Sequence, residues 1–220
     1  MDGFNRDEKT DLCRIMAANR SDKGNPDIYQ AWHNYTIYYD KIFSPWRERP
    51  LRIFELGLGT NDTSIESNMG ENGRPGASLF GWREYFPNAS IFGADIDKKI
   101  LFEFDRIQTF YCNQTSPEDI QVLWQQPSLA ESGFDIMIDD GLHKFQANKC
   151  FFENSIHKLN PGGFYIIEDV TNYRDKEILL KEINNVWKPR FSHLTFEFLE
   201  LPSYWNDLDN NVVVIRFPNI

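Results

Sequence analysis

The chain has 220 residues, with 33 acidic against 23 basic side chains and a net charge of −10. A chain of this length can form one large domain with its own buried core, and its 18 Phe, 9 Tyr and 6 Trp residues exclude disorder as the dominant state. The acidic balance argues against nucleic acid or an anionic membrane surface as the main partner, because both attract basic patches.

The N-terminal segment, residues 1–48, is predicted to be helical. Its apolar residues recur at near-helical spacing and would form one face of a helix: Ile28, Trp32, Tyr35, Tyr39 and Phe43. We expect this segment to pack over the functional site of a main domain that spans residues 49–220.

In the main domain, apolar segments alternate with amphipathic ones. Five apolar segments are predicted to be strands: 52–59, 89–97, 106–115, 134–141 and 162–170. Three segments between them are predicted to be helices: 78–86, 116–126 and 144–159, the last ending at the stop signal Asn160-Pro161-Gly162-Gly163. Alternating strands and helices are typical of a parallel sheet covered by helices on both faces.

Two further apolar segments, 193–201 and 211–217, follow each other without a helix between them. They are predicted to form an antiparallel hairpin at the edge of the sheet. The expected fold class is therefore α/β, a Rossmann-like, doubly wound sheet of seven strands that is mostly parallel, with the N-terminal helical segment added to it.

Three cysteines, Cys13, Cys112 and Cys150, form no CxxC pair, so neither a disulfide framework nor a zinc site is predicted. The polar start of the chain lacks the apolar region of a signal peptide, and no apolar run reaches the ~18 residues of a membrane span. We expect no membrane span and a cytoplasmic location.

Ligands of doubly wound sheets bind at the carboxyl ends of the strands. The first predicted strand ends in Glu55-Leu56-Gly57-Leu58-Gly59, whose glycines allow a tight turn and a close approach of ligand to backbone. An ordinary tight turn would use the same glycines, and the residues that follow do not continue a dinucleotide-binding GxGxxG motif.

Polar residues follow the next strands. Asp95 directly follows an apolar run and is suited to accept hydrogen bonds from a ribose diol. Asp97 is a second candidate for the cofactor, or else the N-cap of a helix. Asn113 and Gln114 could bind an adenine edge, and Asp139 is a further cofactor candidate.

The segment 62–77 is rich in glycine and has no periodicity. A loop of this length inside a compact domain is usually functional. It is either a lid over the ligand or a solvated insertion.

Two acidic pairs end neighbouring strands: Asp139-Asp140, followed by His143, and Glu168-Asp169. Carboxylates that converge in one crevice repel one another unless a cation neutralises them, and oxygen ligands suit Mg²⁺, or else Mn²⁺ or Ca²⁺. Asp140, Glu168 and Asp169 are the candidate metal ligands. His143 is the candidate general base, with Asp140 beside it in the catalytic group. Each acid could instead cap the next helix.

These motifs carry a family resemblance. FELGLGT, GWREYFPNASIFGADID, FDIMIDDGLH and GGFYIIEDV resemble class I S-adenosylmethionine-dependent methyltransferases. More closely, they resemble the metal-dependent sugar O-methyltransferases of the macrocin and mycinamicin type. Residues 21–43 resemble that family's N-terminal motif, and the likeness covers roughly residues 20–175.

The resemblance implies a function. The chain would be a cytoplasmic O-methyltransferase that needs S-adenosylmethionine and Mg²⁺ (or Mn²⁺ or Ca²⁺) and acts on a sugar hydroxyl of a bacterial surface polysaccharide or a natural product. Its substrate would be a small-molecule sugar, a nucleotide-sugar or a glycan, and a homo-oligomer is compatible with the family.

The resemblance also implies roles for single residues. Glu55, Gly57 and Gly59 would line the methionine end of the cofactor, and Asp95 would hold its ribose. Asp140, Glu168 and Asp169 would bind the metal, with His143 as base. Two positions depart from the family pattern: Leu142 stands where a small polar residue is more common, and Asn113 replaces an acid.

Three other functions stay open. A catechol offers a metal the same pair of adjacent oxygens as a sugar diol, so the motifs do not separate the two acceptors. An NAD-dependent sugar oxidoreductase or epimerase would need the missing GxGxxG motif. A non-catalytic binding protein would have no need of four clustered charges.

Overall fold

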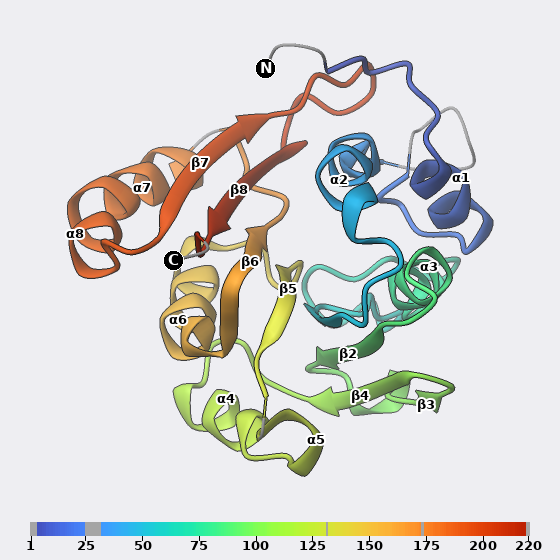
Figure 1. The fold of residues 1–220 in the computed structure, drawn as a ribbon, viewed down its shortest axis with the longest axis horizontal. Helices are drawn as coiled ribbons and strands as arrows, with labels where there is room; N and C mark the ends of the chain where they lie inside the picture. Colours follow the sequence, from blue (N-terminus) through green and yellow to red (C-terminus); the bar gives the residue numbers. More distant parts are fainter. Residues whose placement is uncertain (1–3, 25–31, 131, 173, 219–220) are drawn as a thin grey trace.

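The structure is a computed structural model, and it describes residues 4–24, 32–130, 132–172 and 174–218. These residues form an eight-stranded sheet in the order β3-β4-β2-β1-β5-β6-β8-β7 (Figure 1). The strands are β1 Arg52–Leu56, β2 Ser90–Asp95, β3 Glu103–Phe104, β4 Ile107–Tyr111, β5 Phe134–Asp139, β6 Leu159–Ile167, β7 Thr195–Glu200 and β8 Asn211–Arg216.

The predicted Rossmann-like α/β class is confirmed. The five strands β4, β2, β1, β5 and β6 pair in parallel, and β8 pairs antiparallel with both β6 and β7. The predicted number of seven strands is wrong by one. The additional strand, β3, has two exposed residues that pair antiparallel with β4, and so short and exposed a strand leaves no hydrophobic pattern in the sequence.

The helices of the described chain lie on both faces of the sheet (Figure 1). They are α1 Asp11–Ala18, α2 Tyr35–Phe43, α3 Ala77–Tyr85, α4 Pro117–Trp124, α5 Pro127–Ala130, α6 Phe145–Ser155, α7 Arg174–Glu182 and α8 Lys188–Arg190, with a π-helical turn Ile183–Trp187 between the last two. Short 3₁₀ turns lie at Ser44–Trp46, Lys98–Ile100 and Ile156–Lys158.

One predicted helix boundary is wrong. The helix expected over 144–159 is α6, which ends at Ser155, and the Asn160-Pro161-Gly162-Gly163 signal lies within β6 rather than in a loop. Gly162 has a φ of 85°, and its N–H donates to the carbonyl of Phe217. Gly162 therefore allows the irregular backbone at the start of β6, where the register between β5 and β6 also shifts.

Two hydrophobic cores lie on opposite faces of the sheet. Alternate residues of a strand point to opposite faces, so Ile53 packs in the core beneath α1, α2 and α3, while Phe54 packs in the core beneath α4, α6 and α7. The first of these cores includes Tyr35, Tyr39 and Phe43 of α2. The N-terminal segment thus shares a core with the sheet, and the domain division at residues 48 and 49 stays a prediction.

The helix expected from the N-terminal aromatic residues is shorter than their spacing indicated. Trp32 precedes α2, and Ile28 lies outside the described residues. The three cysteines are free, as expected. No helix in the described part of the chain has the length and apolar surface that a bilayer crossing requires.

Candidate active site

A pocket of about 750 Å³ opens at the carboxyl ends of the parallel strands. Residues that directly follow β1, β2, β4 and β5 line it, among them Gly57, Asn113 and Asp140. The strand order reverses at β1, where β2 lies on one side and β5 on the other. Ligands of this fold class bind at that switch point, and the volume is in the range of small-molecule sites.

The turn after β1 requires glycine at two positions. Gly57 has a φ of 91°, and a Cβ atom there would lie 1.9 Å from the carbonyl oxygen of Asp140. Gly59 has a φ of 73°, and a Cβ atom there would lie 2.3 Å from the side chain of Met69. The turn therefore passes close to the Asp140 backbone on one side and to the loop over the pocket on the other.

Gly57→Ala should destabilise the protein and abolish binding of a ligand in the pocket. The added methyl group would clash with backbone atoms, which cannot move aside as a side chain could, and the left-handed φ adds strain. We therefore expect the free energy of unfolding to fall by about 3 kcal/mol and the melting temperature by about 6–10 °C. Thermal unfolding measures it. Gly70→Ala is the matched control, because Gly70 also has a positive φ, 67°, but a Cβ atom added there would meet no other atom within 4 Å.

Asp95 lies at the end of β2 and lines the pocket. Its Oδ2 accepts from the N–H of Leu58 at 2.7 Å and its Oδ1 from the N–H of Asp97 at 2.8 Å. Burial raises the pKa of Asp95, and these two backbone bonds lower it in part. The carboxylate is thus fixed in orientation, with lone pairs left for a ligand in the pocket.

Three other predicted cofactor residues do not line the pocket. Glu55 is fully buried behind it, where its oxygens accept from Ser78 Oγ and Trp82 Nε1, both at 2.5 Å. Asp97 caps the 3₁₀ turn Lys98–Ile100, the alternative that its sequence position left open. The third, Asp139, lies under the opposite face of the sheet.

Asp139 accepts from Gln114 Nε2 at 2.6 Å and from Asn148 Nδ2 at 3.1 Å. Burial raises its pKa to about 6, although the hydrogen bond from Asn148 lowers it in part. Gln114 and Asn113 do line the pocket, and their contact with an adenine stays a prediction. Gln114 Oε1 also accepts from the N–H of Leu142, so this one side chain connects β4, β5 and the loop after β5.

The loop between β1 and α3 contributes one wall of the pocket. Residues 65–69 line it, and Ser67 Oγ donates to the carbonyl of Leu142 at 3.1 Å. Glu66 pairs with Lys144 at 2.7 Å. The loop thus contacts the segment that carries His143, and its role as a lid stays a prediction.

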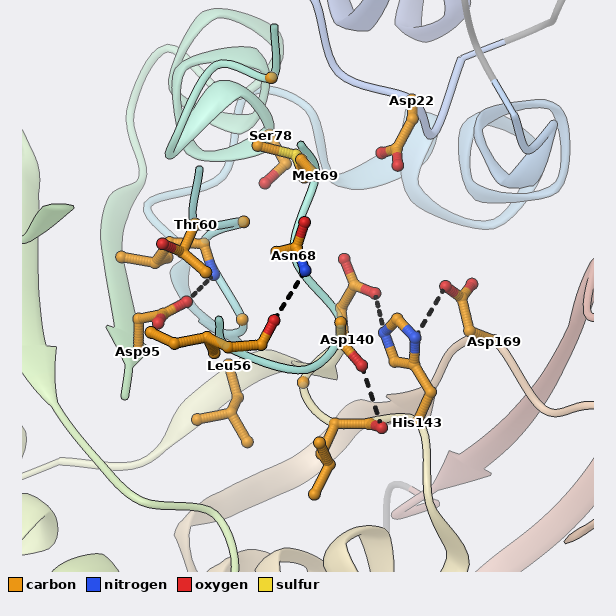
Figure 2. Close-up of a pocket in the computed structure, with 18 of the residues that line it drawn as sticks. Asp22, Leu56, Thr60, Asn68, Met69, Ser78, Asp95, Asp140, His143 and Asp169 are labelled. Carbon is orange, nitrogen blue, oxygen red and sulfur yellow. Dashed lines mark hydrogen bonds and ion pairs between the residues drawn. The ribbon is translucent and has the colours of Figure 1, made fainter. Parts of the chain in front are cut away.

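His143 lies between two carboxylates (Figure 2). Its Nε2 is 3.1 Å from Asp140 Oδ1, and its Nδ1 is 3.4 Å from Asp169 Oδ2. His143 and Asp169 both have left-handed backbone, with φ values of 56° and 55°. Non-glycine residues in this region carry strain that usually persists at functional sites, so the geometry supports a functional role for both.

The two carboxylates set the charge of His143. Burial lowers the pKa of its imidazole, but Asp169 and Asp140 raise it more, to about 10. At such a pKa the ring is protonated at neutral pH. A positive charge placed among these carboxylates would lower the pKa again.

The described residues include one group suited to hold a metal ion. One ligand atom each from Asp140, His143 and Asp169 lies within 4.8 Å of the others. The two carboxylates supply the oxygen ligands that a divalent cation such as Mg²⁺ or Mn²⁺ prefers, and such an ion usually keeps several positions for water or substrate. The residues present therefore fit the metal that the sequence implies.

Glu168, the third predicted metal ligand, is not part of that group. Its side chain is fully buried and accepts from the Tyr39 hydroxyl at 2.6 Å and from the Lys23 ammonium. The structure thus brings together Asp140, Asp169 and His143, with Glu168 directly behind them.

Sequence reasoning missed the donors that satisfy these acids. These donors come from the N-terminal segment: Lys23 on Asp140 and Glu168, Tyr39 on Glu168, and Tyr35 on Asp169. His33, which the sequence had suggested could face the pocket, lies 3.4 Å from Asp169. Tyr35 and Tyr39 are fully buried, so neither can stack on a sugar in the pocket, while Trp32 is 48% exposed and lines the pocket. The i, i+4 spacing of Tyr35 and Tyr39, which places both on one helix face, was the sequence signal that could have identified them as donors to one site.

The sequence of the chain was compared with those of known proteins. No family model matches the chain. It is 36% identical over 160 residues to the 8-demethyl-8-(2-methoxy-alpha-L-rhamnosyl)-tetracenomycin-C 3'-O-methyltransferase of Streptomyces olivaceus, covering 73% of this chain and 37% of that protein. It is 32% identical over 138 residues to the mycinamicin VI 2''-O-methyltransferase of Micromonospora griseorubida, covering 63% of this chain and 32% of that protein. The chain thus spans about a third of the length of the curated relatives it matches.

Among solved structures, the chain is similar to the MycE methyltransferase of mycinamycin biosynthesis in complex with Mg and SAH. The TM-score is 0.68 at 24% identity, over 96% of this chain and 56% of that one. This likeness concerns the fold. The chain is thus similar in sequence to part of sugar O-methyltransferases and similar in fold to a methyltransferase.

Proposed function

We propose that the chain is an S-adenosylmethionine-dependent, divalent-metal-dependent O-methyltransferase that acts on a sugar hydroxyl of a natural product. The observation that carries the proposal is the position of His143 between Asp140 and Asp169, on the wall of the same pocket as Asp95. A base, a cation site and a ribose acceptor in one pocket are what this reaction requires. The names of the relatives support a sugar as the acceptor.

In this proposal the cofactor lies across the carboxyl ends of β1, β2 and β4. Gly57 and Gly59 let the backbone approach its methionine end, and Asp95 accepts from the ribose hydroxyls. Asn113 and Gln114 face the adenine. Glu55, Asp97 and Asp139 support these residues from behind the wall, through Ser78, Thr60 and Gln114.

Asp140 and Asp169 would hold Mg²⁺, or else Mn²⁺ or Ca²⁺, with Glu168 adjacent as the third predicted ligand. The chemistry that a divalent cation supplies in such a site is a lower pKa for a sugar hydroxyl that it binds. His143, which lies between the two carboxylates, would take the proton of the acceptor hydroxyl in its neutral form. The loop over residues 65–69 excludes water and helps to hold acceptor and methyl donor in line.

The finer points stay predictions. The relatives act on sugars of natural products, which supports that setting and gives no support to surface-polysaccharide biosynthesis. A nucleotide-sugar or glycan acceptor, a homo-oligomer and a cytoplasmic location belong to this proposal.

The proposed function is tested by binding and by turnover. Calorimetry should show binding of S-adenosylhomocysteine, and a rhamnosylated natural product should accept a methyl group from S-adenosylmethionine in the presence of Mg²⁺. Methylation of a catechol but of no glycoside would replace the sugar acceptor. Absence of any cofactor binding would contradict the proposal as a whole.

Asp95→Ala should weaken the binding of S-adenosylhomocysteine by about tenfold or more, because the variant removes an acceptor of charge-assisted hydrogen bonds to the ribose. Calorimetry gives the dissociation constant. Asp105→Ala is the control, since this acid is 66% exposed and pairs with Arg83 away from the pocket. An equal loss in both variants would remove Asp95 from the cofactor site.

A further inference from the structure

One buried cation in the site has no part in the proposed reaction. Lys23 lies between α1 and α2 and is only 2% exposed. Its backbone is held on both sides, because its N–H donates to Ser21 Oγ at 3.3 Å and its carbonyl accepts from the N–H of Thr36 at 3.2 Å. The side chain is therefore placed by the fold of the N-terminal segment.

The Lys23 ammonium joins three strand ends. It lies 2.5 Å from Asp140 Oδ2 after β5, in contact with Glu168 Oε2 after β6, and 3.7 Å from Glu55 Oε1 in β1. Lysine is almost never fully buried unless it is paired, and these carboxylates would repel one another without it. The chain thus supplies part of the neutralising charge that the acidic cluster needs.

Lys23 shares a carboxylate with the candidate metal group. Asp140 directs Oδ2 to Lys23 and Oδ1 to His143, and its carboxylate is one of the three ligands in that group. A divalent cation bound there would lie a few ångströms from the ammonium. Two positive charges at that separation repel strongly even at an effective dielectric constant of about 20.

We propose that Lys23 is a built-in cation of this acidic cluster, which neutralises Glu168 and Asp140 in the metal-free protein and competes electrostatically with a divalent cation for them. The lysine keeps the pocket assembled without metal and holds the metal affinity low, so that the ion exchanges readily. This inference rests on the proposed function only for the metal. The charge pairing itself exists without turnover.

The test compares Lys23→Met, which keeps the aliphatic stem and removes the charge, with the wild type. In EDTA the melting temperature of K23M should fall by about 10 °C, because buried carboxylates lose their partner. Calorimetric titration with Mn²⁺ should show at least about tenfold tighter binding, since the competing charge is gone. Saturating Mg²⁺ should accordingly raise the melting temperature of K23M by more than that of the wild type.

Two controls accompany it. Lys23→Arg keeps the positive charge, although its larger planar guanidinium packs differently, and it should bind Mn²⁺ more weakly than K23M does. Lys149→Met breaks another ion pair, with Glu182 at 2.5 Å on the far face of the sheet, and should leave the Mn²⁺ affinity unchanged. A lysine that only fills space would lower the melting temperature of K23M without changing its metal affinity, and that result would overturn the proposal.

The double variant K23M/E168Q covers the case in which K23M does not fold. It removes both charges of the pair, so it should fold and melt above K23M in EDTA, and a double variant that is no more stable would overturn the proposal. If the wild type binds no Mn²⁺ at all, the metal requirement of the proposed function fails, whereas Mn²⁺ binding by K23M alone would still support the role of Lys23. If the wild type binds Mn²⁺ and K23M binds it no more tightly, only the inference fails.

Discussion

His143→Ala should keep the affinity for S-adenosylhomocysteine and lose methyl transfer by about a hundredfold or more. General bases contribute about 10²–10⁴-fold, and no other imidazole among the described residues lies between Asp140 and Asp169. The cofactor affinity is expected to persist because the residues proposed to bind the cofactor follow β1, β2 and β4, whereas His143 follows β5. Steady-state kinetics and calorimetry on the same preparation measure the two quantities.

His157→Ala is the matched control for this variant. His157 lies in the 3₁₀ turn Ile156–Lys158 after α6, away from the pocket wall, and its loss should leave turnover unchanged. If H143A loses cofactor binding together with turnover, His143 has a structural role. If it keeps most of its turnover, the base is another group.

The rate of the wild type should also respond to metal through His143. Without a cation the imidazole pKa is about 10, so the ring is protonated at neutral pH and cannot accept a proton. Chelation should therefore abolish turnover at pH 7 even where the acceptor still binds. Activity that survives EDTA would show that the site works without metal.

The parallel core of the fold was predictable because its signal is local. The strand Phe134–Asp139 carries an unbroken apolar run and ends in acids, as a strand buried on both faces next to a ligand site does. The same logic placed Asp140, His143 and Asp169 together, since parallel strands bring their carboxyl ends to one edge. The strand β3 was not predictable because its two exposed residues leave no hydrophobic pattern. The irregular start of β6 was not predictable because Gly162 pairs with the distant residue Phe217.

The direction of each acid was harder to predict than its position. Glu55 and Ile53 share one face of β1, so Glu55 points under α3 to Ser78 and Trp82 rather than into the pocket. Asp139 points to the opposite face, where Asn148 of α6 donates to it. The pocket is lined instead by Asp95, the last residue of β2, and by residues that follow β1, β4 and β5, such as Gly57, Asn113 and Asp140.

Lys23 was missed for a different reason. In the sequence it is one charge in a polar stretch, and 117 residues separate it from Asp140. Such a contact leaves no trace in composition or periodicity. A surplus of acids at strand ends indicates that some cation must be present, but a side chain and a metal ion satisfy this condition equally.

Asp140→Asn should have the broadest effect of any single change in the pocket. The Asp140 carboxylate pairs with Lys23 and with His143. Partial burial raises its pKa, but these two cations hold the pKa well below its ordinary value. The amide has no charge, so Lys23 loses one partner and the proposed metal loses a ligand. We expect methyl transfer to fall by at least about a hundredfold and the Mn²⁺ affinity by about tenfold or more.

Asp135→Asn provides the control for this change. Asp135 lies in β5, at the end of the strand opposite to Asp140, and its carboxylate accepts from the N–H of Arg52 at 2.8 Å. Its substitution should leave metal affinity and turnover unchanged. The two effects of D140N can then be separated by the concentration of metal. If high Mg²⁺ restores turnover, Asp140 serves mainly as a metal ligand. If turnover stays low at saturating metal, the variant has also lost the carboxylate that positions His143. Unchanged turnover at ordinary Mg²⁺ concentrations would remove Asp140 from the reaction altogether. We expect the opposite, because one Asp140 carboxylate joins a buried lysine, the candidate base and the candidate metal group, which no merely structural acid does.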